Sequence, residues 1–370
     1  MKNKPINLKY DKEVFKKGET KVLYDNVGEG EKNLFVVTIP SQLISAIEAQ
    51  KYFSTKNNVL VILFFVVGNG DNINQLFELS SLFPYDKLIT YQQKDTYNLI
   101  SFKKYLNCIN KYTYNYNFYG HVNLAYRKQF ANIKYNHLYL LDDGTYSLSV
   151  HNLLTQQSKE ENKYIGLDEN LNFKKRLINM IYNFMGIKRN THLNNLNFFT
   201  IFNIKDYNTI ITHDYSHVKS LFSSHKIKDN KIYILGQPFR KIMKMSTFEY
   251  IQAMKEVLDC YPNHQFVYIP HRQEYFSDVF SIFLLQQKNL TVKKLNIAIE
   301  IYFLQKGIVP HQVFSFTSTA LFVLKKIFPK TKIQYIEIDT TFLSAFHQEN
   351  IQLIYENYKK DGIKKFNCQK

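Results

Sequence analysis

Short apolar runs alternate with segments of helical periodicity along the whole chain. Runs rich in Val, Ile, Leu and aromatic residues predict buried strands, and apolar residues that recur every three or four positions predict amphipathic helices. In the first half the predicted strands are 34–38, 59–67, 114–119 and 137–141, and the predicted helices are 42–53, 96–111 and 121–132. Strands that alternate with helices in this way favour a parallel sheet covered on both faces.

A polar stretch over 157–164, a predicted helix over 172–185 and a mostly polar connector over 186–196 interrupt this alternation, which then restarts. The second set of predicted strands is 198–202, 209–212, 231–235, 265–269, 312–316 and 332–338. Ser246 and Glu249 form a capping box that opens a helix ending at Leu258, and a last helix covers 342–359. We therefore predict an α/β fold with two Rossmann-like domains facing a cleft, residues 1–190 and 191–370. Ligands bind such sheets beyond the carboxyl ends of the strands.

Composition narrows the classes of function. The net charge is +17, and it is carried mainly by Lys. This balance fits a Lys-rich solvated surface, and the functional alternative is attraction to anionic substrates or to an anionic membrane face. Nucleic-acid recognition usually relies on Arg, which is scarce in this chain.

Cysteine usage and apolar length indicate the compartment. Cys108, Cys260 and Cys368 are odd in number, widely spaced and without a CxxC pair, so we predict no disulfide framework and a reducing cytosol. The polar N-terminus lacks the apolar core of a signal peptide. The longest apolar run, 59–67, is too short to span a bilayer, so any membrane contact is expected to be peripheral.

Two adjacent carboxylates follow the predicted strand 137–141. Asp142 and Asp143 repel each other when both are ionised, which raises the pKa of one of them towards a value useful for a base. Gly144 lets the backbone turn sharply after them. The structural alternative is an ordinary Asp-Gly turn in which an Asp caps a helix.

Two further segments place polar residues after apolar strands. Pro270, His271 and Arg272 follow the strand 265–269, where a His can meet a phosphate leaving group; the alternative is a structural His. The strand 312–316 leads to Ser318 and Thr319, where a helix begins. Free backbone N–H groups and the helix dipole at that point suit a phosphate, and the alternative is a plain N-cap.

Taken in order, the acidic pair before Gly144, the His beside Pro270 and the Ser318-Thr319 pair resemble the motifs of the bacterial sialyltransferases. The resemblance is closest to the lipooligosaccharide sialyltransferases of glycosyltransferase family 52, and it extends to the more distant marine enzymes and the bacterial polysialyltransferases. The region 297–310 is similar to the family's nucleotide-binding region, and 38–42 to the N-terminal pattern of the lipooligosaccharide enzymes. The resemblance covers nearly the full length. Pro-His replaces the His-Pro of many relatives, and Ser-Thr replaces Ser-Ser.

The resemblance implies a GT-B type fold and an inverting transfer of sialic acid from CMP-sialic acid to a terminal sugar, galactose first among the candidates. The acceptor would be a bacterial surface glycan such as lipooligosaccharide or capsule. Asp143 would act as the base, with Glu249 as its rival, and His271 would protonate or hydrogen-bond the leaving CMP. The remaining positions divide between donor binding (Pro270, Arg272, Glu300, Ser318 and Thr319) and the acceptor side or turn (Asp142, Gly144 and Gln42).

The chain has no DxD element, so we expect neither a metal nor a cofactor beyond the donor. His213 and His217 are spaced like a metal pair but lack a third ligand. The alternatives are another GT-B sugar transferase, such as a glucosyl- or Kdo-transferase, and a basic nucleic-acid-binding protein. The expected partners are CMP-sialic acid and the glycan acceptor, not nucleic acid, with an anionic membrane and a homodimer left open. The expected location is the bacterial cytoplasm or the inner face of the inner membrane.

Overall fold

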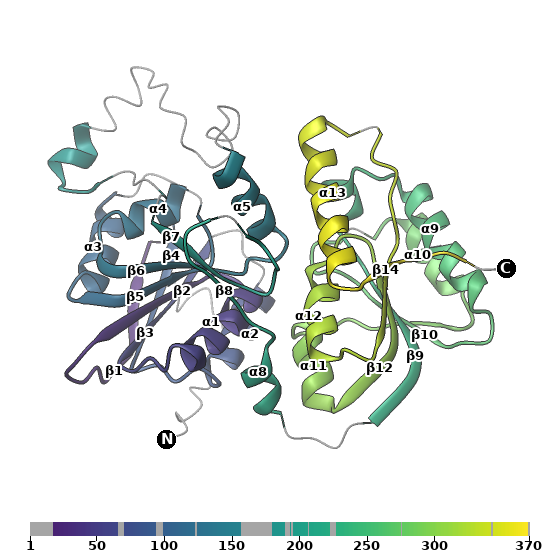
Figure 1. The fold of residues 1–370 in the computed structure, drawn as a ribbon, viewed down its shortest axis with the longest axis horizontal. Coiled ribbons are helices and arrows are strands. Elements are labelled where there is room, and N and C mark those ends of the chain that lie inside the picture. The colour runs from purple at the N-terminus through teal and green to yellow at the C-terminus, as the bar shows by residue number, and fades with distance from the viewer. Residues whose placement is uncertain are drawn as a thin grey trace. The chain divides into compact units, whose positions relative to one another are not determined.

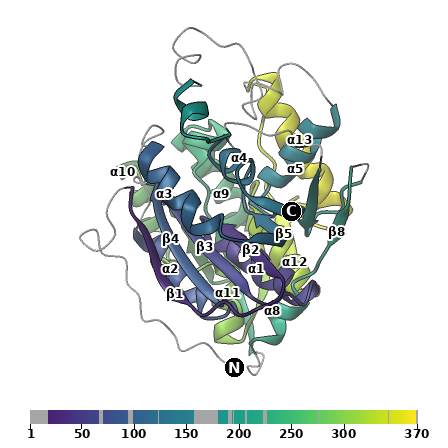
Figure 2. The ribbon, with the colours of Figure 1, turned by 90° about the vertical axis from the view of Figure 1, so that its left-hand side faces the viewer.

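The computed structural model describes residues 18–65, 70–93, 99–122, 124–156, 180–188, 193, 195–205, 207–222, 227–274, 276–341 and 343–368. The chain divides into two compact units, Met1–His213 and Asp214–Lys370. Figures 1 and 2 show that each unit has its own sheet covered by helices.

The N-terminal unit is built on an eight-stranded sheet of order β1-β4-β3-β2-β5-β6-β7-β8. Its strands are β1 (Thr20–Asp25), β2 (Lys32–Val37), β3 (Asn58–Phe65), β4 (Lys87–Gln93), β5 (Thr113–Tyr119), β6 (Lys134–Leu141), β7 (Leu196–Thr200) and β8 (Ile210–Thr212). Its helices include α1 (Pro40–Tyr52), α2 (Gly70–Ser80), α3 (Leu99–Ile109), α4 (Leu124–Phe130) and α5 (Tyr146–Gln156). Edge strand β1 runs antiparallel to β4, and the other described pairs are parallel.

Burial explains why these inner strands form. Residues 59–63 of β3 are completely buried, as expected for a parallel strand covered on both faces. Helices α1 and α2 pack together, and Figure 1 shows them on the opposite side of the sheet from α3 and α4. Strands β3 and β4 follow β2 on one side of the sheet, and β5, β6 and β7 then follow on the other side of β2. The direction of winding therefore switches between β2 and β5.

The C-terminal unit repeats this plan in a fully parallel sheet of order β11-β10-β9-β12-β13-β14. Its strands are β9 (Ile227–Leu235), β10 (Phe266–Ile269), β11 (Leu290–Val292), β12 (Ile308–Ser315), β13 (Lys332–Tyr335) and β14 (Lys364–Lys365). Its helices are α8 (Ser216–Ser220), a π-helical turn (Phe239–Met243), α9 (Thr247–Cys260), α10 (Asp278–Gln286), α11 (Ile299–Lys306), α12 (Thr319–Ile327) and α13 (Ala345–Lys360). Figure 1 shows α9 and α10 on one face and α11, α12 and α13 on the other. Here the winding switches between β9 and β12.

If the strands are renumbered along the chain, with β2 as strand 1 of the first sheet and β9 as strand 1 of the second, their spatial order in both sheets is 3-2-1-4-5-6. This is the order of a Rossmann sheet. The predicted α/β class with two Rossmann-like domains is confirmed. The predicted boundary at residue 190 is wrong, because β7 pairs with β6 and β8 with β7, so that both extend the first sheet up to His213. The predicted loop over 157–164 and the part of the predicted helix 172–185 before residue 180 lie outside the described residues, whereas residues 180–184 are helical as predicted.

Within the described part of the chain, no helix combines the length and the apolar character needed to cross a bilayer.

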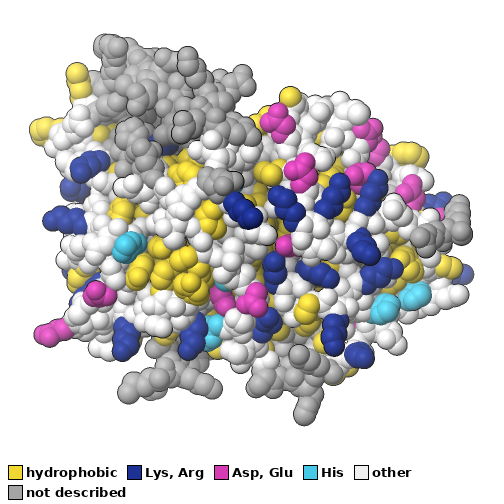
Figure 3. Space-filling model, in the orientation of Figure 1, with side chains coloured by type: hydrophobic (Ala, Val, Ile, Leu, Met, Phe, Trp, Pro, Cys, Tyr) yellow, Lys and Arg dark blue, Asp and Glu magenta, His cyan; other side chains and the backbone are white. Residues whose placement is uncertain are grey.

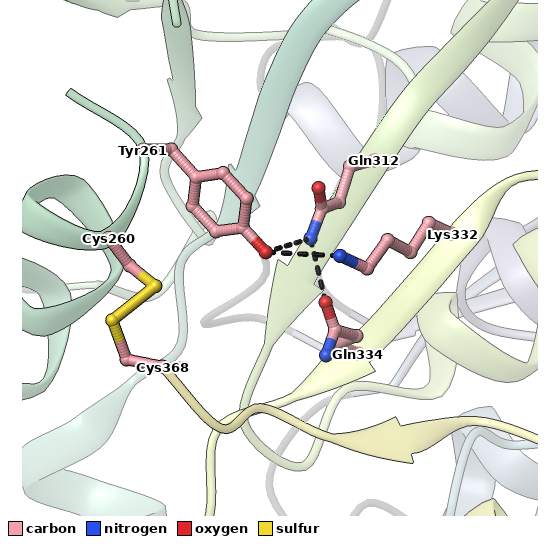
Figure 4. The surroundings of a disulfide bond; sticks show 6 residues. All are labelled: Cys260, Tyr261, Gln312, Lys332, Gln334 and Cys368. Atoms are coloured by element: carbon pink, nitrogen blue, oxygen red, sulfur yellow. Dashed lines mark hydrogen bonds between the residues drawn. A yellow bond between two sulfur atoms is a disulfide. The ribbon is translucent and has the colours of Figure 1, made fainter. Parts of the chain in front are cut away.

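A disulfide joins the end of α9 to the C-terminal tail. Cys260 is bonded to Cys368, with their Cα atoms 5.7 Å apart, whereas Cys108 is not bonded. Next to the bridge, the Tyr261 hydroxyl accepts hydrogen bonds from Gln312 Nε2 and Lys332 Nζ, each at 3.1 Å (Figure 4). The expectation of unpaired cysteines is therefore wrong, and the cysteine pattern no longer favours a reducing compartment. A sequence separation of 108 residues gave no sign of this pairing, which depends on where the tail packs.

We expect reduction of this bridge to lower the free energy of unfolding by about 2–4 kcal/mol, because a long covalent loop restricts the unfolded chain. Urea unfolding of the whole chain with and without dithiothreitol measures the effect. Cys108→Ser should respond to the reductant as the wild type does, and Cys368→Ser should not respond at all. A wild-type unfolding midpoint that ignores the reductant would show that the bridge contributes nothing.

Candidate active site

The two adjacent carboxylates after β6 lie in different surroundings. Asp142 is buried, and its oxygens accept hydrogen bonds from Thr200 Oγ1 at 2.6 Å and from the Ile201 N–H at 2.8 Å. His213 Nε2 lies 3.5 Å from Asp142 Oδ2, and its ring stacks on Phe199. Asp142 therefore ties the end of β6 to the ends of β7 and β8.

Asp143 is the carboxylate that remains accessible. Its side chain is 13% exposed, and its Oδ2 lies 3.5 Å from Nε2 of His121, which follows β5. Its N–H donates to Ser147 Oγ at 3.1 Å, and Gly144 adopts a φ of +65°, which confirms the predicted sharp turn.

His121 was not singled out from the sequence. Its ring stacks on that of Tyr146 with centroids 4.3 Å apart, and burial lowers the pKa of His121 to about 4. The imidazole is therefore neutral near pH 7, so that the negative charge of Asp143 faces a dipole rather than a cation.

Gln42 bridges the winding switch of the N-terminal sheet. Its Oε1 accepts from the Thr38 N–H at 2.7 Å, and its Nε2 donates to the Gly120 carbonyl at 3.0 Å. A Cβ at Gly120 would lie 2.1–2.6 Å from the Gln42 side chain, so this position requires glycine. The Tyr126 hydroxyl donates to Thr38 Oγ1 at 2.9 Å and extends the network. The Gln42 amide is thus used within the protein, and its predicted acceptor-side role stays a prediction.

In the C-terminal unit, the Pro-His-Arg segment turns directly after β10. The Gln273 N–H donates to Nδ1 of His271 at 3.1 Å, which puts the proton of the neutral ring on Nε2. Burial, reinforced by the charge of Arg272, lowers the pKa of His271 to about 4. Arg272 itself is exposed, and Pro270 is half-buried. His271 is therefore a neutral hydrogen-bond donor near pH 7, which favours the second of its two expected roles.

A carboxyl that the sequence analysis missed lies against this turn. Glu274 Oε2 accepts the His271 N–H at 2.9 Å, and Oε1 accepts the Tyr268 hydroxyl. A Cβ on Gly236, which follows β9, would lie 2.2 Å from Glu274 Oε2. Burial raises the pKa of Glu274 to about 7. The only signal for it in the sequence is its place three residues after His271.

The hydroxyl pair begins α12, next to the switch between β9 and β12. Ser318 is the N-cap, and its Oγ accepts from the Ala320 N–H at 3.3 Å, while Thr319 is the first helical residue. Buried Ser315 donates to the Leu235 carbonyl at 2.8 Å and joins the two strands at the switch. The capping role is present, and the N-terminus of this nine-residue helix also presents its dipole at the strand ends.

Glu300 lies in the first turn of α11 and is 7% exposed. Burial is the main cause that raises its pKa, and a hydrogen bond with its own backbone acts in the opposite direction. Its predicted contact with the donor nucleotide stays a prediction.

The rival base has a structural explanation. The Ser246 N–H donates to Glu249 Oε2 at 2.6 Å, and the Glu249 N–H donates to Ser246 Oγ at 3.2 Å, which confirms the predicted capping box. These bonds lower the pKa of exposed Glu249, so this carboxylate is a weak base. Among the described residues, no three His, Cys, Asp or Glu side chains are grouped so as to hold a metal ion.

Lysine dominates the charge on the C-terminal unit. Exposed lysines include Lys330, Lys332, Lys359, Lys360 and Lys364, and Figure 3 shows Lys and Arg side chains gathered over one face of this unit. Such a surface is well solvated and also attracts anions through long-range electrostatics.

No protein-family model and no curated protein sequence matches the chain. Similar solved structures include an α/β-galactoside α-2,3-sialyltransferase from the luminous marine bacterium Photobacterium phosphoreum, 12% identical with a TM-score of 0.47, covering 91% of this chain and 99% of that chain. The E. coli heptosyltransferase WaaC with ADP is 8% identical with a TM-score of 0.40, covering 89% and 98%. The Methanocaldococcus jannaschii UDP-GlcNAc 2-epimerase with UDP-GlcNAc and UDP is 12% identical with a TM-score of 0.45, covering 89% and 92%. Likeness at this level assigns no activity.

The two neutral histidines predict a sensitivity to acid. His121 and His271 each have a pKa of about 4 in the folded protein, against 6.5 for an unperturbed ring. Between these values the unfolded chain binds protons that the folded chain does not, so the free energy of unfolding falls as the pH drops through this window. We expect His121→Gln and His271→Gln each to flatten that fall, by at most about 1.4 kcal/mol per pH unit.

Urea unfolding at several pH values between about 7 and 4 measures the slope. His347 is exposed, so His347→Gln is the control and should leave the slope unchanged. If the free energy of unfolding changed with pH equally steeply in all three variants, the fold would hold neither the His121 ring nor the His271 ring neutral.

Proposed function

We propose that this chain is an inverting glycosyltransferase that moves sialic acid from CMP-sialic acid to a terminal sugar, such as galactose, of a bacterial surface glycan. The supporting observation is that the motifs, which follow one another along the sequence, lie at the ends of strands. Asp143 pairs with His121 beside the switch of one Rossmann-order sheet, and His271 and Ser318 follow the two strands on either side of β9 in the other. Parallel sheets bind ligands at such strand ends.

In the proposed reaction Asp143 removes the proton of the acceptor hydroxyl as that oxygen attacks the anomeric carbon of the donor. A base must be ionised and reachable by the substrate, and the Asp143 carboxylate is partly exposed beside a neutral imidazole. Asp142 cannot take this role, because its oxygens are occupied by Thr200 and Ile201.

On the donor side, the leaving group is the phosphate of CMP. The Nε2–H of His271 would donate a hydrogen bond to a phosphate oxygen, and the start of α12 at Ser318 and Thr319 would offer backbone N–H groups and a positive dipole end. Glu300 would accept hydrogen bonds from the ribose hydroxyls. These groups stabilise the departing charge, and the proposal includes no metal ion.

CMP should raise the melting temperature more than UDP or GDP does. A ligand that binds only the folded state stabilises it by about 2.7 kcal/mol at 100 times its Kd. Thermal unfolding with each nucleotide at equal concentration measures the preference. Equal shifts with all three nucleotides would remove the sialyl donor from the proposal, and a preference for UDP or GDP would favour a different sugar transferase.

Asp143→Asn should lower kcat by ~10²–10⁴ and leave CMP binding nearly intact, because it removes the base and keeps the side-chain size. The assay is transfer from CMP-sialic acid to a panel of galactosides in the presence of EDTA. Glu249→Gln is the matched control and should retain transfer, since Glu249 caps α9. Normal activity in Asp143→Asn together with inactivity of a stable Glu249→Gln would place the base in the C-terminal unit.

A further inference from the structure

We propose that Glu274 is a positioning residue that fixes the ring of His271 in one tautomer. In this tautomer the ring carries its proton on Nε2 and donates from there. This role rests on the proposed function, in which that N–H contacts the donor phosphate. Glu274 belongs to the same turn as His271, and its side chain also reaches into the core of the C-terminal unit.

The turn after β10 is held from both sides. Glu274 Oε2 accepts the His271 N–H at 2.9 Å, and the Glu274 N–H donates to the His271 carbonyl at 2.9 Å. These two hydrogen bonds also hold Gln273 in place. The Gln273 N–H donates to His271 Nδ1 at 3.1 Å. The Nδ1 atom is therefore an acceptor, and only Nε2 can carry the proton of the neutral ring.

The other oxygen of Glu274 is anchored through two tyrosines. The Gln237 N–H lies 3.2 Å from the Tyr250 hydroxyl, the Tyr250 and Tyr268 hydroxyls are 3.1 Å apart, and Tyr268 donates to Glu274 Oε1. Both tyrosines are fully buried, and burial raises their pKa values well above 10. Both tyrosines therefore remain protonated. Because Tyr268 donates to Glu274 and the Gln237 N–H donates to Tyr250, the hydrogen bonds of this series run towards Glu274.

This polarity explains why the residue is Glu rather than Gln. Each carboxylate oxygen faces a donor, the His271 N–H on one side and the Tyr268 O–H on the other. A carboxamide or a protonated carboxyl would have to direct its own hydrogen at Tyr268, which would reverse the direction of the bonds between the two tyrosine hydroxyls. The arrangement therefore favours the ionised form, although burial raises the pKa of Glu274 to about 7.

Gly236 gives independent evidence that this strand end is shaped around the carboxyl. A Cβ there would lie 2.2 Å from Glu274 Oε2, 2.4 Å from the Tyr268 hydroxyl and 3.0 Å from the His271 N. The titratable side chains that face Glu274 are Tyr250 of α9 and Tyr268 of β10, and in its own turn Glu274 meets the backbone N–H of His271, whose ring feels the charge of Arg272. The tyrosines do not titrate near neutrality, so the clamp should weaken as the pH falls through about 7.

The test is nitrogen-15 NMR of the histidine rings in the full chain, which reports the tautomer directly. The His271 ring is assigned by its absence in His271→Gln. In the wild type at about pH 8 we expect the Nε2–H tautomer, and in Glu274→Gln a mixture of tautomers, with kcat lowered ~10–100-fold by misplacement of the donor. Glu256→Gln, at an exposed Glu of α9 outside the proposed site, is the matched control and should change neither readout.

An unchanged His271 tautomer in a folded Glu274→Gln would overturn the proposal. If that variant does not fold, Tyr268→Phe removes one donor to the carboxyl with little change in volume. It should shift the pH at which the wild-type tautomer is lost, and no shift would equally overturn the proposal. The tautomer is read without nucleotide, so a wild type with the expected ring but no affinity for CMP would refute the proposed function and leave the positioning role standing.

Discussion

In each unit, a glycine follows a central strand and the space of its missing Cβ is filled by a polar side chain. Gln42 occupies this space at Gly120 in the N-terminal unit, and Glu274 occupies it at Gly236 in the C-terminal unit. Both side chains then satisfy backbone groups at the carboxyl end of the sheet, where loops from separate strands must converge. Without this close packing the turns that carry His121 and His271 would lose their support.

These surroundings determine which groups in the candidate site carry charge. Burial keeps both His121 and His271 neutral, so neither ring adds a positive charge beside Asp143 or at the turn that carries Glu274. In the proposed function, the positive groups offered to an anionic donor are the N-terminus of α12 and exposed Arg272. A neutral donor beside a helix dipole stabilises a phosphate without competing for its proton.

The inner strands could be predicted from the sequence because they are buried on both faces. The run 59–63 of β3 shows this pattern clearly, whereas edge strand β1 is largely exposed and was not predicted. The domain boundary was misplaced because β7 and β8 resemble the start of a new alternation, and local pattern does not say which sheet a strand will join. Strand pairing is a non-local property.

The candidate site was predictable where polar residues follow a strand directly, as Asp143 and His271 do. His121 and Glu274 were missed because what distinguishes them is burial and a partner brought close by folding. The different surroundings of Asp142 and Asp143 also appear only in three dimensions, since Thr200 ends β7 and Ile201 follows it, both far along the chain.

The bridge between Cys260 and Cys368 closes a covalent ring that contains β10 to β14 and leaves β9 outside it. A protease that cuts once within this ring produces two pieces that stay joined until the bridge is reduced. Because β9 pairs with both β10 and β12, each piece can also keep its place in the sheet. The covalent ring therefore gives the C-terminal unit a second connection that holds it together after a single break in its backbone.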